Sequence, residues 1–412
     1  MSEVRGARSS RRPIFTRIRS VLTSTRFSEE HLVMAAALMA TLLILLYAFG
    51  ALETKGEVWR ATFGGPGFDV GSSVLEKAGG LVVAGRTNSF GAGEYDGWLI
   101  ATDSKGRELW NRTIGGPGGD EATAIVAAGG GGYAIAGGTG SFGAGGSDGW
   151  LVRTDHQGRE VWNRTFGGTG DDWAYSLQET GDGYVILGET DSFGAGGRDL
   201  WLLKADPQGR EVWNRTFGGT GDDGGRSIKR TADGFIIAGF TESRGAGGKD
   251  LWLLKADSNG SEVWNVTFGG SKDDIGEAVI ERAGGGYVVA GGASVPPEGG
   301  LGDAWLIITD DQGSPLRGKI FSVGDSGRDL ATTVAATADG GYIVGGWSSA
   351  GGLYSWLLKT DGAGEKEWDF TIPDSGREEG SSLLVAEDGG YVTCGWTISS
   401  GNPDMILAKV KR

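Results

Sequence analysis

The chain has 412 residues and a formal net charge of −15 at pH 7, with 80 Gly, 9 Pro, 2 His and a single Cys. Scarce proline and the lack of a three-residue glycine period exclude a collagen-like chain. The 15 Trp provide apolar surface for a core and argue against a disordered chain. The single Cys excludes an internal disulfide, the two His leave little scope for His-based zinc sites, and the acidic balance disfavours nucleic acid as a partner because phosphates would be repelled.

The first 50 residues differ in charge from the rest of the chain. They hold seven Arg and three Glu, a net charge of +4, so the remainder carries −19. Residues 32–52 contain no charge, and at about 1.5 Å per residue they can cross a hydrocarbon core of about 30 Å. Basic residues on the N-terminal side favour a cytoplasmic N-terminus. We therefore predict a basic cytoplasmic tail over residues 1–30, one transmembrane signal-anchor helix over residues 31–52, and an extracytoplasmic remainder at the cell membrane. A cleaved signal peptide is the alternative, since residues 48–51 include small residues.

Seven repeats follow. The phrase WNRTFGG begins at residues 162 and 213, variants begin at 59, 110, 264 and 368, and a divergent copy, KIFSVGD, begins at 319. The unit over residues 174–217 contains four short strand patterns separated by Gly- and Asp-rich turns. A period near 50 residues with four strands a unit is typical of propeller blades. We predict an all-β, seven-bladed β-propeller of four-stranded antiparallel blades over residues 56–412.

The two ends of the repeat region complement each other. The first unit begins with an isolated fourth-strand pattern, GEVWRATF, and the last unit ends after a third-strand pattern, DMILAKVKR. Pairing these segments would complete the last blade and remove two unprotected sheet edges. We expect the N-terminal strand to close the ring. The alternative, an open solenoid, would need capping units and would not have complementary ends.

LWLLKADPQGREVWNRTF resembles the repeat of pyrroloquinoline-quinone-type propellers, and the longer unit resembles tandem repeats of uncharacterised archaeal and bacterial surface proteins. The resemblance extends over residues 56–412 and implies the propeller fold. Quinone enzymes of that family use a vicinal Cys pair, a bound Ca²⁺ and usually eight blades. This chain has one Cys and seven units, so we expect no cofactor and a non-catalytic scaffold member of the fold.

Acidic residues recur at the start of each blade and predict one acidic face. The series comprises Asp69, Asp120, Asp172, Asp223, Asp274, Asp329 and Glu378. A second series precedes the third strands: Asp96, Asp148, Asp199, Asp250, Asp303 and Asp404. Either the face binds a cation or a basic partner, or each Asp accepts hydrogen bonds from the backbone of its own Gly-rich turn. Whether a metal binds there is left open.

Two loops depart from the repeat and are candidate ligand determinants, because loops on a rigid scaffold carry function. The residues concerned are Pro296, Pro297, Glu298, Asp303, Leu353 and Tyr354. Five Asn begin N-x-T or N-x-S sequences and are candidate N-glycosylation acceptors: Asn111, Asn163, Asn214, Asn259 and Asn265. The repeated Trp residues are expected to pack between blades, with sugar stacking as the alternative.

Catalysis requires one unique constellation of acid and base, whereas the acids here repeat. We therefore expect a membrane-anchored, extracytoplasmic binding or scaffold module without enzymatic activity, whose partner is an envelope protein or a glycan. A carbohydrate-active surface enzyme and a purely structural envelope protein are the alternatives.

Overall fold

The computed structural model describes residues 57–77, 79–294, 302–323, 327–349, 352–372, 377–398 and 401–411. The predicted tail (1–30), the predicted transmembrane helix (31–52) and the loop residues Pro296, Pro297 and Glu298 lie outside these ranges, and only the backbone of Glu378 is described. Among the described residues, no helix has the length and apolar character needed to span a bilayer.

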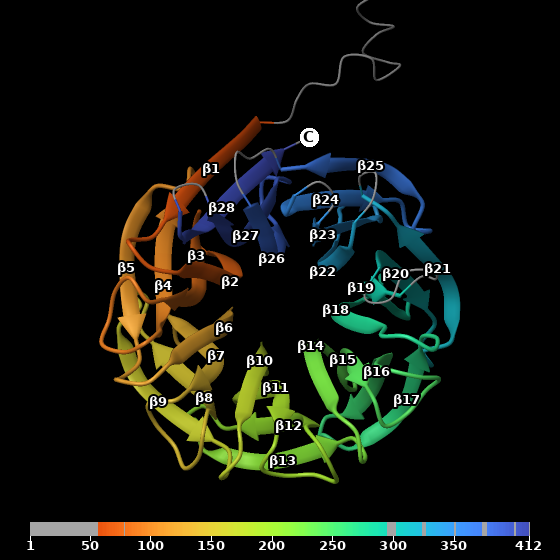
Figure 1. Ribbon diagram of the computed structural model, residues 1–412, viewed down its shortest axis with the longest axis horizontal. Helices are drawn as coiled ribbons and strands as arrows, with labels where there is room; N and C mark the ends of the chain where they lie inside the picture. Colours follow the sequence, from red (N-terminus) through yellow and green to blue (C-terminus); the bar gives the residue numbers. More distant parts are fainter. Residues whose placement is uncertain are drawn as a thin grey trace, which may run out of the picture. The chain divides into compact units, whose positions relative to one another are not determined.

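The described residues form a ring of seven four-stranded antiparallel sheets (Figure 1). Six blades follow the chain from the axis to the rim. Blade one contains β2 (Asp69–Lys77), β3 (Gly80–Thr87), β4 (Asp96–Asp103) and β5 (Glu108–Ile114). Blade two contains β6 (Asp120–Ala127), β7 (Tyr133–Thr139), β8 (Asp148–Thr154) and β9 (Glu160–Phe166). Blade three contains β10 (Asp172–Glu179), β11 (Tyr184–Thr190), β12 (Asp199–Ala205) and β13 (Glu211–Phe217).

The second half of the ring repeats this order. Blade four contains β14 (Asp223–Thr231), β15 (Gly234–Thr241), β16 (Asp250–Asp257) and β17 (Glu262–Phe268). Blade five contains β18 (Ile275–Glu281), β19 (Tyr287–Ala293), β20 (Asp303–Thr309) and β21 (Pro315–Phe321). Blade six contains β22 (Asp329–Ala336), β23 (Tyr342–Ser348), β24 (Tyr354–Thr360) and β25 (Lys366–Thr371). Blade seven contains β26 (Arg377–Val385), β27 (Tyr391–Ile398), β28 (Pro403–Lys411) and β1 (Glu57–Phe63).

The burial of each strand within a blade explains its pattern of apolar and polar residues. The two middle strands lie between neighbouring blades on both faces, so every residue of β11 and β12 is buried. Such strands show continuous apolar runs rather than alternation. The outer strand β13 contains only exposed and half-buried residues, because only one of its faces meets the next blade. Clusters of buried apolar side chains fill the interfaces between neighbouring blades.

The predicted role of the repeated Trp residues in packing is visible at the turns between third and fourth strands. Gly106 adopts a φ of 75°, and a Cβ on it would lie 2.4 Å from an atom of the Trp59 ring in the preceding blade. The same arrangement joins Gly158 to Trp110. Glycine is needed here both for the left-handed conformation and for the close approach of the ring.

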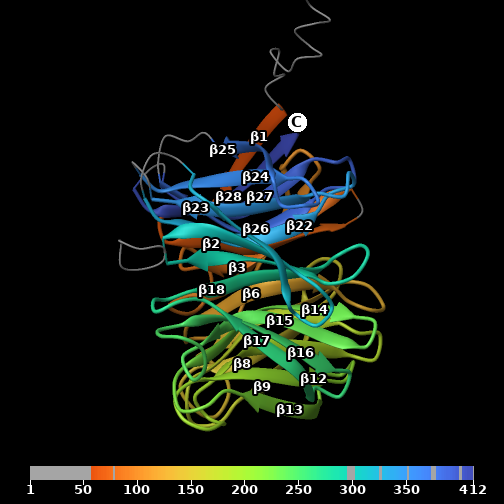
Figure 2. The ribbon, with the colours of Figure 1, turned by 90° about the vertical axis from the view of Figure 1, so that its right-hand side faces the viewer.

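The predicted ring closure is confirmed. Strand β1 pairs with β28 along its whole length, from Glu57 opposite Lys411 to Phe63 opposite Met405. Trp59 and Phe63 pack against the core between blades seven and one, where the single cysteine, Cys394, is also buried. Figures 1 and 2 show β1 beside β28 at the rim of blade seven. Burial raises the pKa of the Cys394 thiol to about 12, as expected for a thiol enclosed in apolar surroundings.

Every innermost strand contains a β-bulge at the same position. In blade three the pairing of β10 with β11 shifts between Ala174 and Ser176, which leaves Tyr175 as the extra residue. The seven extra residues are Ser72, Thr123, Tyr175, Arg226, Glu277, Thr332 and Ser381. Bulges redirect side chains and often occur near functional sites, and all seven of these residues line the cavity at the ring axis.

Candidate functional site

The repeated Asp residues at the start of the first strands are buried and satisfied by hydrogen bonds within their own blade. Asp172 has no exposed surface; its Oδ2 accepts hydrogen bonds from the Gly168 backbone N–H at 2.9 Å and from the Ser192 hydroxyl at 2.6 Å, and its Oδ1 accepts one from Thr190. Equivalent bonds reach Asp69, Asp120 and Asp223. This geometry favours the structural alternative, in which each Asp holds its own Gly-rich turn.

The second series of Asp residues faces the first across each blade junction. Gly218 lies between Asp199 and Asp223, and a Cβ on this glycine would lie 1.9 Å from Asp199 Oδ1 and 2.7 Å from Asp223 Oδ2. Burial raises the pKa of the Asp199 carboxyl, and the charge of Asp223 raises it further. Within the described ranges, no group of three or more His, Cys, Asp or Glu side chains is arranged to hold a metal ion.

The irregular loops contribute three described residues. Asp303 Oδ1 accepts a hydrogen bond from the Ser322 hydroxyl at 2.9 Å. Tyr354 packs against the core between blades five and six, and its hydroxyl donates to the Val323 carbonyl at 3.1 Å. Leu353 is half-buried. These contacts show that Asp303 and Tyr354 anchor the loop ends, while the loop tips lie outside the described residues.

The candidate glycosylation acceptors lie on outer strands, apart from Asn259, which is exposed in a turn. Asn163 Nδ2 donates to Glu160 Oε1 at 2.6 Å, and Asn214 makes the same contact with Glu211. Asn111 and Asn265 repeat it. These amides thus have a structural partner three residues earlier, and the assignment as glycosylation acceptors stays a prediction.

The ring axis contains a cavity of about 560 Å³ lined by the seven innermost strands. On four blades the bulge residue is a small hydroxyl side chain: Ser72, Thr123, Thr332 or Ser381. On blades three, four and five it is Tyr175, Arg226 and Glu277. The large and charged bulge side chains therefore lie on three adjacent blades, and together they form one wall of the cavity.

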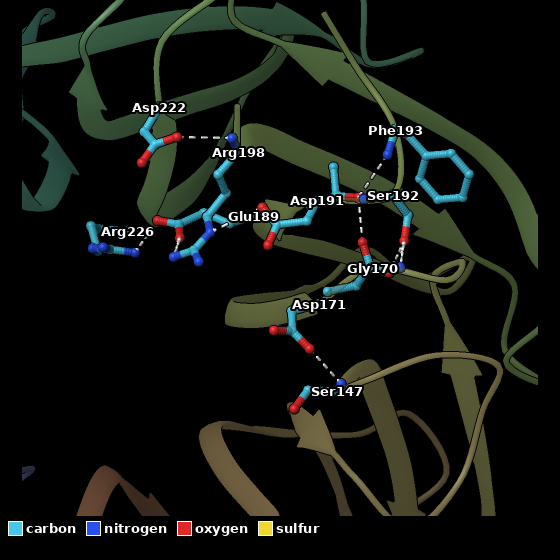
Figure 3. A network of polar contacts seen from close by, with 12 residues as sticks. Ser147, Gly170, Asp171, Glu189, Asp191, Ser192, Phe193, Arg198, Asp222 and Arg226 are labelled. Atoms are coloured by element: carbon cyan, nitrogen blue, oxygen red, sulfur yellow. Dashed lines mark hydrogen bonds and ion pairs between the residues drawn. The ribbon is translucent and has the colours of Figure 1, made fainter. Parts of the chain in front are cut away.

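A polar network fixes Arg226 in place (Figure 3). Its guanidinium forms an ion pair with Glu189 of blade three, and Glu189 also pairs with Arg198 at 3.2 Å. Glu189 is only 1% exposed, so this carboxylate requires both cations to offset the cost of burial. The Arg226 guanidinium also lies 4.7 Å from the centre of the Tyr175 ring and 5.1 Å from that of Phe240.

Glu277 completes this wall. Burial raises the pKa of its carboxyl, and Arg226 and Lys249 partly oppose this effect. Among the described residues no hydrogen bond reaches this carboxyl group, in contrast to the repeated Asp residues. Burial also raises the pKa of the Tyr175 hydroxyl. The wall therefore presents a carboxyl that is open to a hydrogen bond from a ligand.

The repeat pattern did not predict this wall, because the residues that form it differ from unit to unit. The variable positions of the first and second strands are the sequence feature that could have indicated it. The residue paired with the one that follows the repeated acid is Arg86, Gly138, Glu189, Phe240, Gly292, Trp347 or Trp396, and the bulge position is equally varied.

Comparisons with known proteins add little to this geometry. No family model matches the chain, and no curated protein matches it. Among solved structures, the quinohemoprotein alcohol dehydrogenase ADHIIG of Pseudomonas putida HK5 is 13% identical with a TM-score of 0.45, and the match covers 82% of this chain and 66% of that one. The β-propeller domain of the Trilobed protease of Pyrococcus furiosus is 10% identical with a TM-score of 0.45, over 84% of this chain and 96% of that one. Sqt1 of Chaetomium thermophilum is 11% identical with a TM-score of 0.45, over 86% of this chain and 100% of that one.

The class of the protein follows from its own strand pairing: it is a seven-bladed β-propeller closed by its N-terminal strand.

Proposed function

We propose that this chain is a membrane-anchored, extracytoplasmic binding module that takes its ligand in the axial cavity and does not catalyse a reaction. The observation that carries the proposal is the gathering of Tyr175, Arg226 and Glu277 on adjacent bulges of a scaffold whose other blades place small hydroxyls there. A binding site needs one asymmetric surface on a rigid support, and closed blades with buried interfaces supply the support.

The ligand site can be tested with a glycan array and the full-length chain in detergent. We expect Arg226→Ala combined with Tyr175→Ala to abolish binding of any glycan that the wild-type protein retains. The matched control is Ser72→Ala with Ser381→Ala, which changes two bulges on other blades and should weaken binding less. Equal losses in the two double variants would contradict a site on blades three to five.

The anchor is supported by the uncharged run over residues 32–52 and the Arg-rich flank before it. Protease added to intact cells or spheroplasts should digest the repeat region and spare residues 1–30. Protection of the repeat region would reverse the topology, and a mature N-terminus near residue 51 would replace the anchor with a cleaved signal peptide.

An enzyme acting on a surface carbohydrate is the second candidate. It is favoured by Glu277, whose raised pKa and lack of a hydrogen bond within the described residues suit a general acid, and by the positive charge of Arg226 close to this carboxyl. Release of sugar products by the wild-type protein, lost in Glu277→Gln, would favour this candidate over a binding module.

A further inference from the structure

Lys229 is the one cation in the cavity wall to which the described structure gives no partner. It lies on β14 three residues after the bulge, at a position where the other blades place Leu75, Val126, Gln178, Ile280, Ala335 and Leu384. No ion pair or hydrogen bond joins its ammonium to any described residue. Lys229 lines the cavity and is more than a third exposed, and the protein around the amine lowers its pKa. A charged amine in this position lacks part of its hydration and would gain from an anion.

The other charged groups of the wall are Arg226, Glu277 and Glu281. Arg226 is already neutralised by Glu189. Glu281 also lines the cavity, on the neighbouring strand β18, without forming an ion pair to Lys229. Burial raises the pKa of Glu277, which lessens its negative charge without removing it. A ligand that enters the cavity therefore meets Lys229 as the available cation.

Hydroxyl groups line the same cavity, and those of three serines still have a hydrogen to donate. Ser227 Oγ accepts a hydrogen bond from the Val279 backbone N–H at 3.2 Å, and Ser176 Oγ accepts one from the Ile228 N–H at 3.4 Å. Ser73 Oγ repeats this contact with Ile125. A hydroxyl that accepts from the backbone still has its own hydrogen to donate. The serines thus present donors to a ligand rich in oxygen.

We infer that the axial cavity binds a sugar acid, a small polyhydroxylated carboxylate, with its carboxylate on Lys229 and its hydroxyl groups against the serines of the innermost strands. This inference rests on the proposed function and specifies the ligand class. A cavity of about 560 Å³ falls within the range of about 300–1,000 Å³ found for small-molecule sites. A neutral sugar would leave Lys229 without an anion, and a plain anion would leave the hydroxyl donors unused.

Lys229 and Glu277 have opposite charges, so their substitutions should change the affinity in opposite directions. Lys229 attracts a carboxylate, whereas an ionised Glu277 repels it. Removing the lysine should therefore weaken binding, and neutralising the glutamate should strengthen it. A cation ligand would show the reverse pattern in both variants.

The experiment is isothermal titration calorimetry at pH 7 on the full-length chain in detergent, with D-glucuronate as the probe, D-glucose as its neutral counterpart and tetragalacturonate as an acidic chain. We expect glucuronate to bind and glucose to bind at least tenfold more weakly. Lys229→Met should weaken glucuronate binding about tenfold or more, since a charge-assisted hydrogen bond is lost. Lys229→Arg should retain binding within a few-fold, and Glu277→Gln should tighten it. Lys272→Met, which removes an exposed lysine in a loop, is the charge-matched control and should leave the affinity unchanged.

Tetragalacturonate distinguishes a free sugar acid from the end of an acidic glycan: tighter binding than the monosaccharide, with the same dependence on Lys229, assigns the glycan as source. Equal affinity of wild-type protein and a folded Lys229→Met variant would overturn the inference, as would equal binding of glucose. If glucuronate fails to bind while a glycan from the array still depends on Tyr175 and Arg226, the ligand class is wrong and the proposed function stands. If no ligand depends on these residues, both fail.

Discussion

Two regions of this propeller use positions that are equivalent in every blade. One region repeats the same residue from blade to blade, and the other varies it. At the blade junctions the same Asp recurs, and each described carboxylate in the first series accepts hydrogen bonds from its own loop or a nearby side chain. In the axial cavity the bulge positions carry Ser, Thr, Tyr, Arg and Glu, and Glu277 and Lys229 lack hydrogen-bond partners among the described residues. The difference teaches that in a repeat protein the residues that recur maintain the scaffold, and the residues that vary are the ones available to a ligand.

The largest expected effect concerns the strand that completes the scaffold. Deleting residues 57–63 removes β1, its ladder with β28 and the packing of Trp59 and Phe63 on the blade-seven core. Each lost hydrogen bond is worth about 0.5–1.5 kcal/mol, so the loss is on the order of several kcal/mol and leaves an open edge. Thermal melts should show a much lower Tm and aggregation, with Trp59→Ala in between. Equal Tm values would contradict the closed ring.

The second prediction compares the two regions directly. Asp172→Ala leaves buried donors without an acceptor and should cost about 1–3 kcal/mol for each one, because a stranded donor loses its hydration without replacement. Tyr175→Ala, three residues further along the same strand, should cost less in denaturant unfolding yet change ligand binding more. The comparison fails if the bulge variant is the less stable of the two.

The third prediction tests the close approach of the paired carboxylates. Gly218→Ala places a methyl group against Asp199 and Asp223 and should cost about 1–3 kcal/mol, the range expected for overpacking. Gly270→Ala is the matched control in the next junction, where a Cβ would meet no atom within 4 Å. Unfolding midpoints in urea measure both variants, and similar midpoints would show that the junction can relax.

The smallest expected effect is a dependence on pH. The pKa of Asp199 is raised in the folded protein, so its contribution to stability is full below its unfolded pKa and is lost as the pH rises through the folded pKa. The stability of the wild-type protein relative to Asp199→Asn should therefore fall between pH 4 and pH 7. The pKa of Asp206, in an exposed turn, is lowered by its hydrogen bonds with Arg210, so for Asp206→Asn the wild-type advantage should rise as the pH rises toward the ordinary pKa of 3.8 and stay level from there to pH 7. Parallel pH profiles for the two variants would refute this assignment of signs.

The fold could be predicted from the sequence because its determinants are local and repeated. The 50-residue period, the Asp-x-x-Gly turns at Asp103 and Asp155 and the unmatched strands at the two ends determine blade number and closure. The cavity wall could not be predicted in the same way. Tyr175, Arg226 and Glu277 belong to different units about 51 residues apart, and only the bulge turns them toward one cavity. A bulge is a shift in pairing register, which no single residue type specifies.

The bulge also bears on how such a protein can acquire new specificity. The extra residue stands outside the pairing register, and the seven blades already tolerate five residue types there. A point mutation at one bulge changes the chemistry of the lumen without moving a strand or opening a blade interface. Duplication of a unit supplies a new copy of the position, and subsequent divergence needs to alter only that codon. The propeller thus has seven positions around one cavity at which a single substitution can change what the cavity binds.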